Sequence, residues 1–286
     1  MIGLGRLSQI DSRLKEIRPD YADQAFGGLT ILLAGDLRQL PPVGDLSIYT
    51  QDGGALNQCL GRVLYRMFDS YSYLLQSQMR QQGDENALFR DQLERLARGT
   101  FTQEDWHCWS ARNFDVMDRQ DQTEFFEKAT LLCAKKKDSV AFNHKHLKLT
   151  KNPIAKLTAL NSRGAASYEA DQANGLRNKL YLAKEAKIVL TSNIWPEAKL
   201  VNGSKGTIKY LIYKDGGQDL PDLVICHFPC YTGPTFIPGE DNLVPIASIQ
   251  ATWFAKNQQF SRRQYPLMLG WSITIHKGQG NTVVIL

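Results

Sequence analysis

The stretch Leu29-Thr30-Ile31-Leu32-Leu33-Ala34-Gly35-Asp36-Leu37-Arg38-Gln39 decides how the first part of this chain is interpreted. Its apolar run, 29–34, predicts a short and fully buried strand. Gly35-Asp36 interrupts that strand, and Pro41-Pro42 then forces an extended exit. The segment therefore places a carboxylate and an amide just past a strand end, where open α/β sheets bind ligands.

A second segment, near the C-terminus, has the same organisation. Thr274-Ile275-His276-Lys277-Gly278-Gln279-Gly280 also follows an apolar stretch, so polar and charged side chains again come after an expected strand. Taken alone, each segment has an ordinary explanation. Asp36 suits a simple turn, and a single histidine such as His276 after an apolar strand is usually structural.

Length and composition are compatible with a soluble globular protein of two ordinary domains or one large one. The 286 residues are 43% apolar and 22% charged, which is close to the average for globular proteins. The formal net charge is 34 − 29 = +5; it permits a nucleic-acid partner but equally fits a slightly basic enzyme. The 5 cysteines are irregularly spaced, which argues against a disulfide framework and for a reducing compartment.

The sequence shows no recognisable targeting signal. No apolar run approaches the ~18 residues of a membrane span, and no basic segment leads into an apolar one as in a signal peptide. Lys135-Lys136-Lys137 is too short for a clear nuclear-import cluster. We expect an intracellular protein with no membrane contact, and we favour the nucleus over the mitochondrion.

Periodicity predicts alternating helices and strands in most of the chain. Asp84 is a candidate cap for the helix that Gly99 stops, and Thr102 with Asp105 resembles a capping box. After Val201 the glycines mark off short β-like runs, which suggests a small antiparallel barrel or sheet at about 196–262. The expected helices are 4–18, 84–98 and 138–149, and the expected strands are 29–34, 129–134, 186–192, 206–213, 223–228 and 243–249.

Four segments together resemble one protein family. Residues 26–43 resemble motif III of the petite integration frequency (PIF) helicases of superfamily one. Residues 79–84 are similar to motif IV, 202–207 to an Asn-Gly-x-x-Gly turn, and 264–280 to motif V with its lead-in. The segments occur in the family's order, and such an ordered set is more specific than any single motif.

The resemblance implies a fold and an activity. The fold would be α/β, with incomplete RecA-like P-loop NTPase domains and a small β-rich, barrel-like insert in the second domain. Residues 1–110 would be the C-terminal part of the first domain and 111–286 the second domain, with the insert at about 196–262. The activity would be 5′-to-3′ DNA unwinding with ATP and Mg²⁺. The partners would be single-stranded DNA and duplex junctions, and the protein would act as a monomer.

The resemblance also assigns roles to residues. Gln39 would sense the γ-phosphate, with Gly35 and Asp36 supporting its loop, and Arg80 would act like an arginine finger. Without motif IV around it, Arg80 would be interpreted as a surface arginine in an ion pair. Gln279 and Gly280 would lie near the nucleotide. The residues expected to contact DNA are Thr274, His276 and Lys277.

The sequence departs from the family pattern in four ways. The sequence contains no G-x-x-x-x-G-K-[ST] phosphate loop, no Asp-Glu pair before motif III and no motif VI. Gly278 stands where motif V usually has serine. We therefore expect a partial helicase chain that does not hydrolyse ATP alone. The alternatives are a non-enzymatic remnant that binds nucleic acid or protein, and an unrelated α/β hydrolase with accidental matches.

Two further patterns are weaker. Cationic and aromatic residues interleave in the β-rich insert, which is typical of single-strand grooves but also of a plain solvated face. Cys226-His227-Phe228-Pro229-Cys230 offers three possible zinc ligands, but the alternation of a strand would split them between faces. We expect no metal site there. The interleaved residues are Lys205, Lys209, Tyr210, Tyr213 and Lys214.

Overall fold

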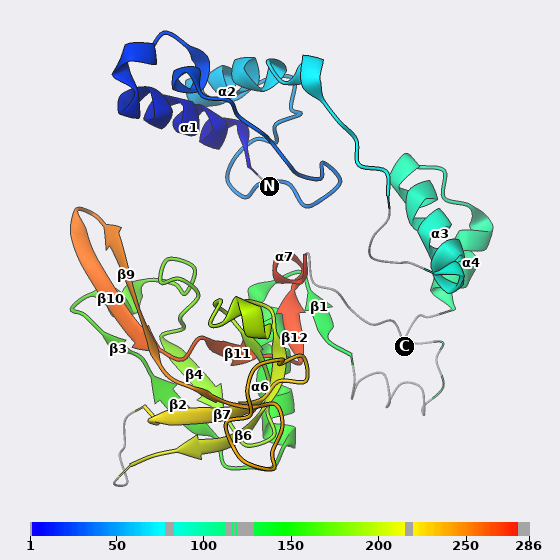
Figure 1. The fold of residues 1–286 in the computed structure, drawn as a ribbon. Coiled ribbons are helices and arrows are strands. Elements are labelled where there is room, and N and C mark those ends of the chain that lie inside the picture. Colours follow the sequence, from blue (N-terminus) through cyan, green and yellow to red (C-terminus); the bar gives the residue numbers. More distant parts are fainter. Residues whose placement is uncertain are drawn as a thin grey trace. The chain divides into compact units, whose positions relative to one another are not determined.

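The structure, a computed structural model, describes residues 2–77, 83–111, 116, 118, 129–214 and 220–279. The chain divides between Met117 and Asp118 into two compact units. Within the described ranges, unit 1 holds helices and extended segments, whereas every strand belongs to unit 2 (Figure 1). No described helix has both the length and the apolar composition that crossing a membrane requires.

Unit 1 begins with two packed helices. Helix α1 (Leu4–Ile17), which periodicity predicted, lies against α2 (Leu56–Arg66). Their small core is formed by Leu7, Phe26 and Leu64. The turn after α1 reverses the chain through positive φ angles at residues 26–28. This turn is fixed because the Phe26 amide donates a 2.6 Å hydrogen bond to the buried carboxylate of Asp11.

The second helical pair of unit 1 is bounded by local signals. Helix α3 (Ala87–Arg98) stops at left-handed Gly99, and α4 (Gln103–Ser110) begins at the predicted capping box of Thr102 and Asp105. The expected cap at Asp84 is wrong: Asp84 lies in a preceding 3₁₀ turn and makes no cap bond. The 3₁₀ turns of unit 1 are Pro19–Tyr21, Ala25–Gly28, Asp69–Tyr71 and Asp84–Asn86.

The predicted buried strand at 29–34 is wrong in this structure. The segment is extended but unpaired, and Leu29 and Leu32 are 42% and 91% exposed. A strand forms when a neighbouring strand accepts its backbone hydrogen bonds. No described segment of unit 1 pairs with residues 29–34. The apolar composition is that of a strand, but the pairing partner is not among these residues.

Unit 2 contains one parallel strand pair. Strand β1 (Leu131–Cys133) pairs in parallel with β12 (Ser272–Thr274), and α6 (Lys136–Leu149) connects from β1 and packs beside them. A short helix, α7 (Ile275–Gly278), follows β12 directly. The strand at 129–134 and the helix at 138–149 were predicted. Full burial of that strand is wrong, because Leu131 and Leu132 are exposed and only Cys133 is buried.

The remaining strands of unit 2 form antiparallel sheets. The largest has the order β11-β5-β6-β7-β8, a second has β3-β10-β9, and a third pairs β2 with β4. Their bounds are Ala155–Thr158 (β2), Leu160–Asn161 (β3), Lys179–Leu182 (β4), Lys187–Leu190 (β5), Lys205–Ile212 (β6), Leu223–His227 (β7), Leu243–Ile246 (β8), Ile249–Ala255 (β9), Gln258–Gln264 (β10) and Leu267–Leu269 (β11). Two 3₁₀ turns, Ala165–Ser167 and Pro196–Ala198, lie between strands.

These sheets revise the predicted insert. The predicted strands at 186–192, 206–213 and 223–228 are confirmed as β5, β6 and β7, and residues 243–249 divide between β8 and β9. No sheet among the described residues closes into a barrel. The main sheet also includes β5 and β11, which lie outside 196–262, so the insert is not a separate layer.

The main sheet carries the largest core of unit 2. Side chains from β5, β6, β7 and β8 pack with β4, α6 and β11, and Leu190, Ile208 and Val224 are fully buried. A buried arginine organises the smaller sheet. Arg262 on β10 donates hydrogen bonds to Asn161 Oδ1 and to three backbone carbonyls. It therefore has a structural role, since its charge is desolvated but hydrogen-bonded.

Candidate nucleotide and nucleic-acid sites

The loop expected to sense a nucleotide is an exposed turn in unit 1. The Arg38 amide donates to Asp36 Oδ1 at 3.0 Å, and the Gln39 amide donates to the Asp36 carbonyl at 3.1 Å. Asp36 thus supports the loop, as predicted, through a local side-chain turn. A Cβ at Gly35 would meet no atom within 4 Å, so nothing in unit 1 as described requires glycine there.

An ion-pair bridge connects this loop to α3. Glu94 on α3 accepts from Arg38 Nη1 at 3.1 Å and from Arg98 Nε at 2.9 Å. The hydrogen bond from Arg38, followed by that from Arg98, lowers the pKa of Glu94. Sequence reasoning missed this bridge, because residues 56 positions apart carry no pattern that joins them. It links the predicted motif III loop to the helix that follows motif IV.

Two predicted site residues lie outside the described residues. Arg80, the expected arginine finger, falls in 78–82, and Gly280 is the first residue of 280–286. Their roles remain predictions. The expected convergence of Gln39 and Arg80 on one triphosphate pocket is therefore untested.

The predicted DNA-contacting segment of unit 2 is held by a buried polar network. Asn143 on α6 donates to the Ser272 carbonyl at 2.8 Å and accepts from the Ser272 amide at 2.9 Å. The Ser272 hydroxyl donates to the Ser139 carbonyl at 2.9 Å. All three residues are buried. Because each polar group is paired, the network fixes the end of β12 against α6.

The segment that follows this network carries the polar side chains of Thr274, His276 and Lys277. Thr274 is half-buried and occupies the N-cap position of α7, although its hydroxyl makes no cap bond. His276 is exposed, and the Lys277 ammonium lies 3.6 Å from Met268 Sδ. Desolvation, followed by repulsion from Arg177, lowers the pKa of Lys277. The structure thus brings Thr274, His276, Lys277 and Gln279 together on one turn.

The glycine that departs from the family pattern has a local explanation. A Cβ built on Gly278 would lie 2.9 Å from Leu132 Cδ2 and 3.6 Å from Ile273 Cδ1. A serine there would require the end of the Leu132 side chain to move by a few tenths of an ångström. The departure is therefore a small packing difference at the β1–α7 contact.

Most of the interleaved cations of the insert have partners. Lys205 Nζ donates to Thr130 Oγ1 at 3.1 Å, and Lys209 pairs with Glu185 at 3.0 Å. Lys184 lies over the Tyr210 ring, 5.6 Å from its centroid. The described face of β6 therefore offers less uncommitted charge than its sequence suggests. Within the described ranges, no group of three His, Cys, Asp or Glu side chains could hold a metal ion.

Comparison with known proteins finds similarity to one group of helicases. No family model matches the chain. It is 27% identical over 270 residues to the ATP-dependent DNA helicase PIF1 of Xenopus laevis, covering 90% of this chain and 36% of that protein. The Pif1 helicase of Candida albicans has a similar structure, with a TM-score of 0.64, 20% identity and coverage of 99% of this chain and 63% of that one. This chain is similar to the PIF1-type helicases.

A second solved structure that this chain resembles contains bound ligands. A Bacteroides Pif1 helicase in complex with ADP-AlF3 and single-stranded DNA matches with a TM-score of 0.57 at 20% identity. It covers 99% of this chain and 60% of that one. These likenesses confirm the predicted RecA-like α/β fold class and the PIF1-type resemblance. The chain spans about 36% of the length of the Xenopus relative.

The PIF1-type resemblance implies ATP and Mg²⁺, and the residues present fit only part of such a site. Gly35, Asp36 and Gln39 supply one loop with an amide side chain. The sequence has no phosphate loop to surround the β- and γ-phosphates. The described residues contain no cluster of carboxylates for a metal. The described residues therefore account for only one loop of a nucleotide site.

Proposed function

We propose that this chain is part of an ATP-dependent DNA helicase that couples ATP hydrolysis to 5′-to-3′ translocation on single-stranded DNA and to duplex unwinding. The observation that carries this proposal is the similarity to PIF1 along 90% of the chain, together with the ordered turn at the end of β12. The protein would act as a monomer at junctions of single and double strands, inside the cell and in the nucleus.

The DNA-contacting role is assigned to the turn after β12. The Thr274 hydroxyl would donate to a backbone phosphate, His276 would contact backbone or base, and Lys277 would add a cation. The buried pairing of Ser272 with Asn143 supports this assignment because it fixes the turn before DNA binds. The matched Bacteroides helicase binds single-stranded DNA.

The nucleotide-sensing role is assigned to unit 1. Gln39 would hydrogen-bond the γ-phosphate or the attacking water, and Arg80 would neutralise charge on the transferring phosphoryl group. Gly35 and Asp36 would shape the loop, whereas Gln279 and Gly280 would couple the nucleotide to the DNA. The Asp36 turn and the Arg38–Glu94 bridge support a fixed loop.

Direct binding tests the DNA role. Fluorescence anisotropy with labelled oligothymidylate would compare the wild type with His276→Ala and Lys277→Gln. We expect each variant to weaken binding several-fold at low salt, and Lys277→Gln to reduce the salt slope by about 0.7. The control is Lys156→Gln, which also removes one positive charge, from an exposed position on β2. Equal affinities for Lys277→Gln, Lys156→Gln and the wild type would contradict the assignment.

Turnover tests the nucleotide role. We expect the purified chain to hydrolyse no more ATP than its Arg80→Ala variant, because the phosphates lack their main ligands. ATP hydrolysis by the wild type that clearly exceeds the variant would show that the chain already contains a working site.

A second candidate function follows from the absence of G-x-x-x-x-G-K-[ST] in the 286 residues. The chain would then be a DNA- or protein-binding module that no longer uses ATP. Oligothymidylate affinity in the presence and absence of ATP separates the two candidates when measured on the protein with its complete flanking regions. A helicase changes affinity with nucleotide, whereas a simple binding module does not.

A further inference from the structure

Three cations and one carboxylate meet near the DNA-contacting turn of unit 2. Lys136 is the first residue of α6, Arg177 lies two residues before β4, and Lys277 lies in α7. Lys136 Nζ contacts Asp171 Oδ2 at 2.6 Å. Arg177 and Lys277 are both close enough to interact electrostatically with Asp171. We call these four residues the phosphate cluster; its formal charge is 3 − 1 = +2.

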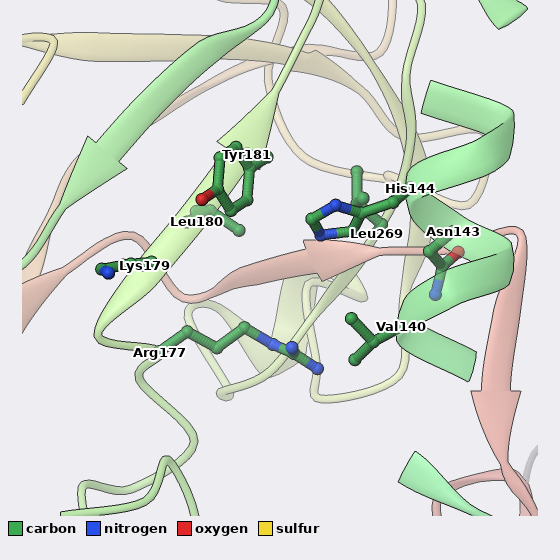
Figure 2. Close-up of a pocket in the computed structure, with 8 residues that line it drawn as sticks. All are labelled: Val140, Asn143, His144, Arg177, Lys179, Leu180, Tyr181 and Leu269. Atoms are coloured by element: carbon green, nitrogen blue, oxygen red, sulfur yellow. The ribbon is translucent and has the colours of Figure 1, made fainter. Parts of the chain in front are cut away.

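Arg177 reaches into a pocket beside α6. Figure 2 shows its side chain extending toward Val140 of α6, below His144 and Tyr181. The guanidinium is half-buried and makes no hydrogen bond to the residues that the structure describes. Desolvation is the main cause that lowers the pKa of Arg177. Partial desolvation strengthens the attraction between a guanidinium and a nearby anion, so this position favours an anion.

Lys277 completes the cationic side of the cluster. Its side chain is exposed overall, but its ammonium lies against the sulfur of Met268. Met268 precedes Leu269, which lines the pocket that Arg177 enters. Lys277 and the pocket therefore both contact β11, although successive residues of a strand face opposite sides of the sheet.

Asp171 forms a direct ion pair with Lys136 of the cluster. Glu169 is a second carboxylate, close enough to interact electrostatically with Arg177. The Asp171 side chain is 63% exposed, and that of Lys136 is 72% exposed. An ion pair this exposed contributes little to stability. Asp171 can therefore leave Lys136 at small cost when another anion arrives.

We propose that Lys136, Arg177 and Lys277 bind one backbone phosphate of single-stranded DNA, and that Asp171 occupies this phosphate position in the DNA-free protein. The inference rests on the proposed function, because it names a further contact of the same DNA site. A carboxylate and a phosphodiester each carry one negative charge and accept hydrogen bonds from the same donors. DNA binding would replace one anion with the other, and Asp171 would lower the affinity for DNA.

The decisive variant is Asp171→Asn in the 286-residue chain. Anisotropy with labelled oligothymidylate at low salt should show binding about three- to fivefold tighter than in the wild type, because a competing charge is removed. The control is Glu240→Gln, which removes one negative charge from an exposed position of the same unit outside the cluster. This control separates the local effect from a general change in net charge.

A second pair of variants tests the cations. We expect Arg177→Gln to weaken binding several-fold at low salt, with Arg177→Lys restoring much of the affinity because it keeps the positive charge. Circular dichroism would identify a loss of folding in Arg177→Gln. Asp171→Asn is independent of that concern because Asp171 is exposed.

The outcomes separate this inference from the proposed function. If the wild type binds DNA and Asp171→Asn binds no more tightly than Glu240→Gln, Asp171 does not compete and the inference fails while the DNA role stands. Weaker binding by Asp171→Asn would mean that the carboxylate holds Lys136 in position, which also overturns the inference. If neither the wild type nor any variant binds oligothymidylate, the proposed DNA role of the chain fails.

Discussion

The loop at 35–39 and the turn at 274–279 each follow an apolar segment, but different contacts hold them. The turn extends from β12, which pairs with β1 and is fixed to α6 by buried hydrogen bonds from Asn143. The loop extends from an unpaired segment and is held by the exposed Arg38–Glu94 bridge and a local turn. Buried networks are much more costly to break than exposed ion pairs. The turn of unit 2 is therefore more firmly held than the loop of unit 1.

The largest expected difference is between a core strand of unit 2 and the apolar segment 29–34 of unit 1. Leu190→Ala in β5 should lower the free energy of unfolding by about 2–5 kcal/mol, because it leaves a cavity in the main core. Leu32→Ala should change it by less than about 0.5 kcal/mol, because Leu32 is 91% exposed. Urea unfolding followed by circular dichroism measures both. A large loss for Leu32→Ala would show that residues 29–34 are packed after all.

The next effect concerns the buried network beneath the turn. Asn143→Ala should cost about 1–3 kcal/mol, because the backbone groups of Ser272 lose their partners while buried. Asn152→Ala removes one exposed hydrogen bond to the Lys184 carbonyl and should cost much less. The same urea titration compares the two asparagines. Similar losses would mean that the network does not fix β12.

A smaller effect tests the local contacts of unit 1. Thr102→Ala should destabilise α4 by about 1 kcal/mol, since its hydroxyl caps the Asp105 amide. Thr100→Ala, which loses only a 3.4 Å contact to the Arg95 carbonyl, is the matched control. Helical circular dichroism during thermal unfolding gives both values. If the two threonines prove equivalent, the capping box contributes nothing measurable to unit 1.

The smallest effect is a pH dependence in unit 2. Desolvation, followed by repulsion from Lys145 and Lys187, lowers the pKa of His146, whose ring lies against Phe142 and Trp271. The unfolded chain then binds a proton that the folded chain excludes, so stability should fall as the pH drops below about 6.5. His146→Phe should remove part of this fall. Urea midpoints that decline equally with pH in the variant and the wild type would contradict this account.

The elements that the sequence predicts correctly are those encoded by neighbouring residues. The stripe of α1, the glycine that stops α3 and the capping box at Thr102 each depend on residues within a few positions. The strand at 29–34 is wrong because strand formation depends on a distant partner. Periodicity cannot report whether that partner is present.

In the candidate site, too, the sequence predicts features of neighbouring residues but not contacts between distant segments. The sequence placed Thr274, His276 and Lys277 after an apolar strand, and in the structure they lie at the end of β12 and in α7. Their contact with DNA stays a prediction. The Arg38–Glu94 bridge and the phosphate cluster were missed, because their members come from separate segments and each resembles a solvated side chain. Arg262 was missed for the opposite reason: an arginine in an alternating strand gives no sign that four hydrogen bonds bury it.

Photocrosslinking of 4-thiothymidine oligonucleotide to the chain, with the modified peptides mapped by mass spectrometry, tests the central claim most directly. If the turn after β12 is the DNA site, crosslinks concentrate on the peptide that contains Thr274, His276 and Lys277, and they decrease in Lys277→Gln. Crosslinks confined to unit 1, or distributed evenly over both units, would contradict the claim that the turn of unit 2 carries the DNA site.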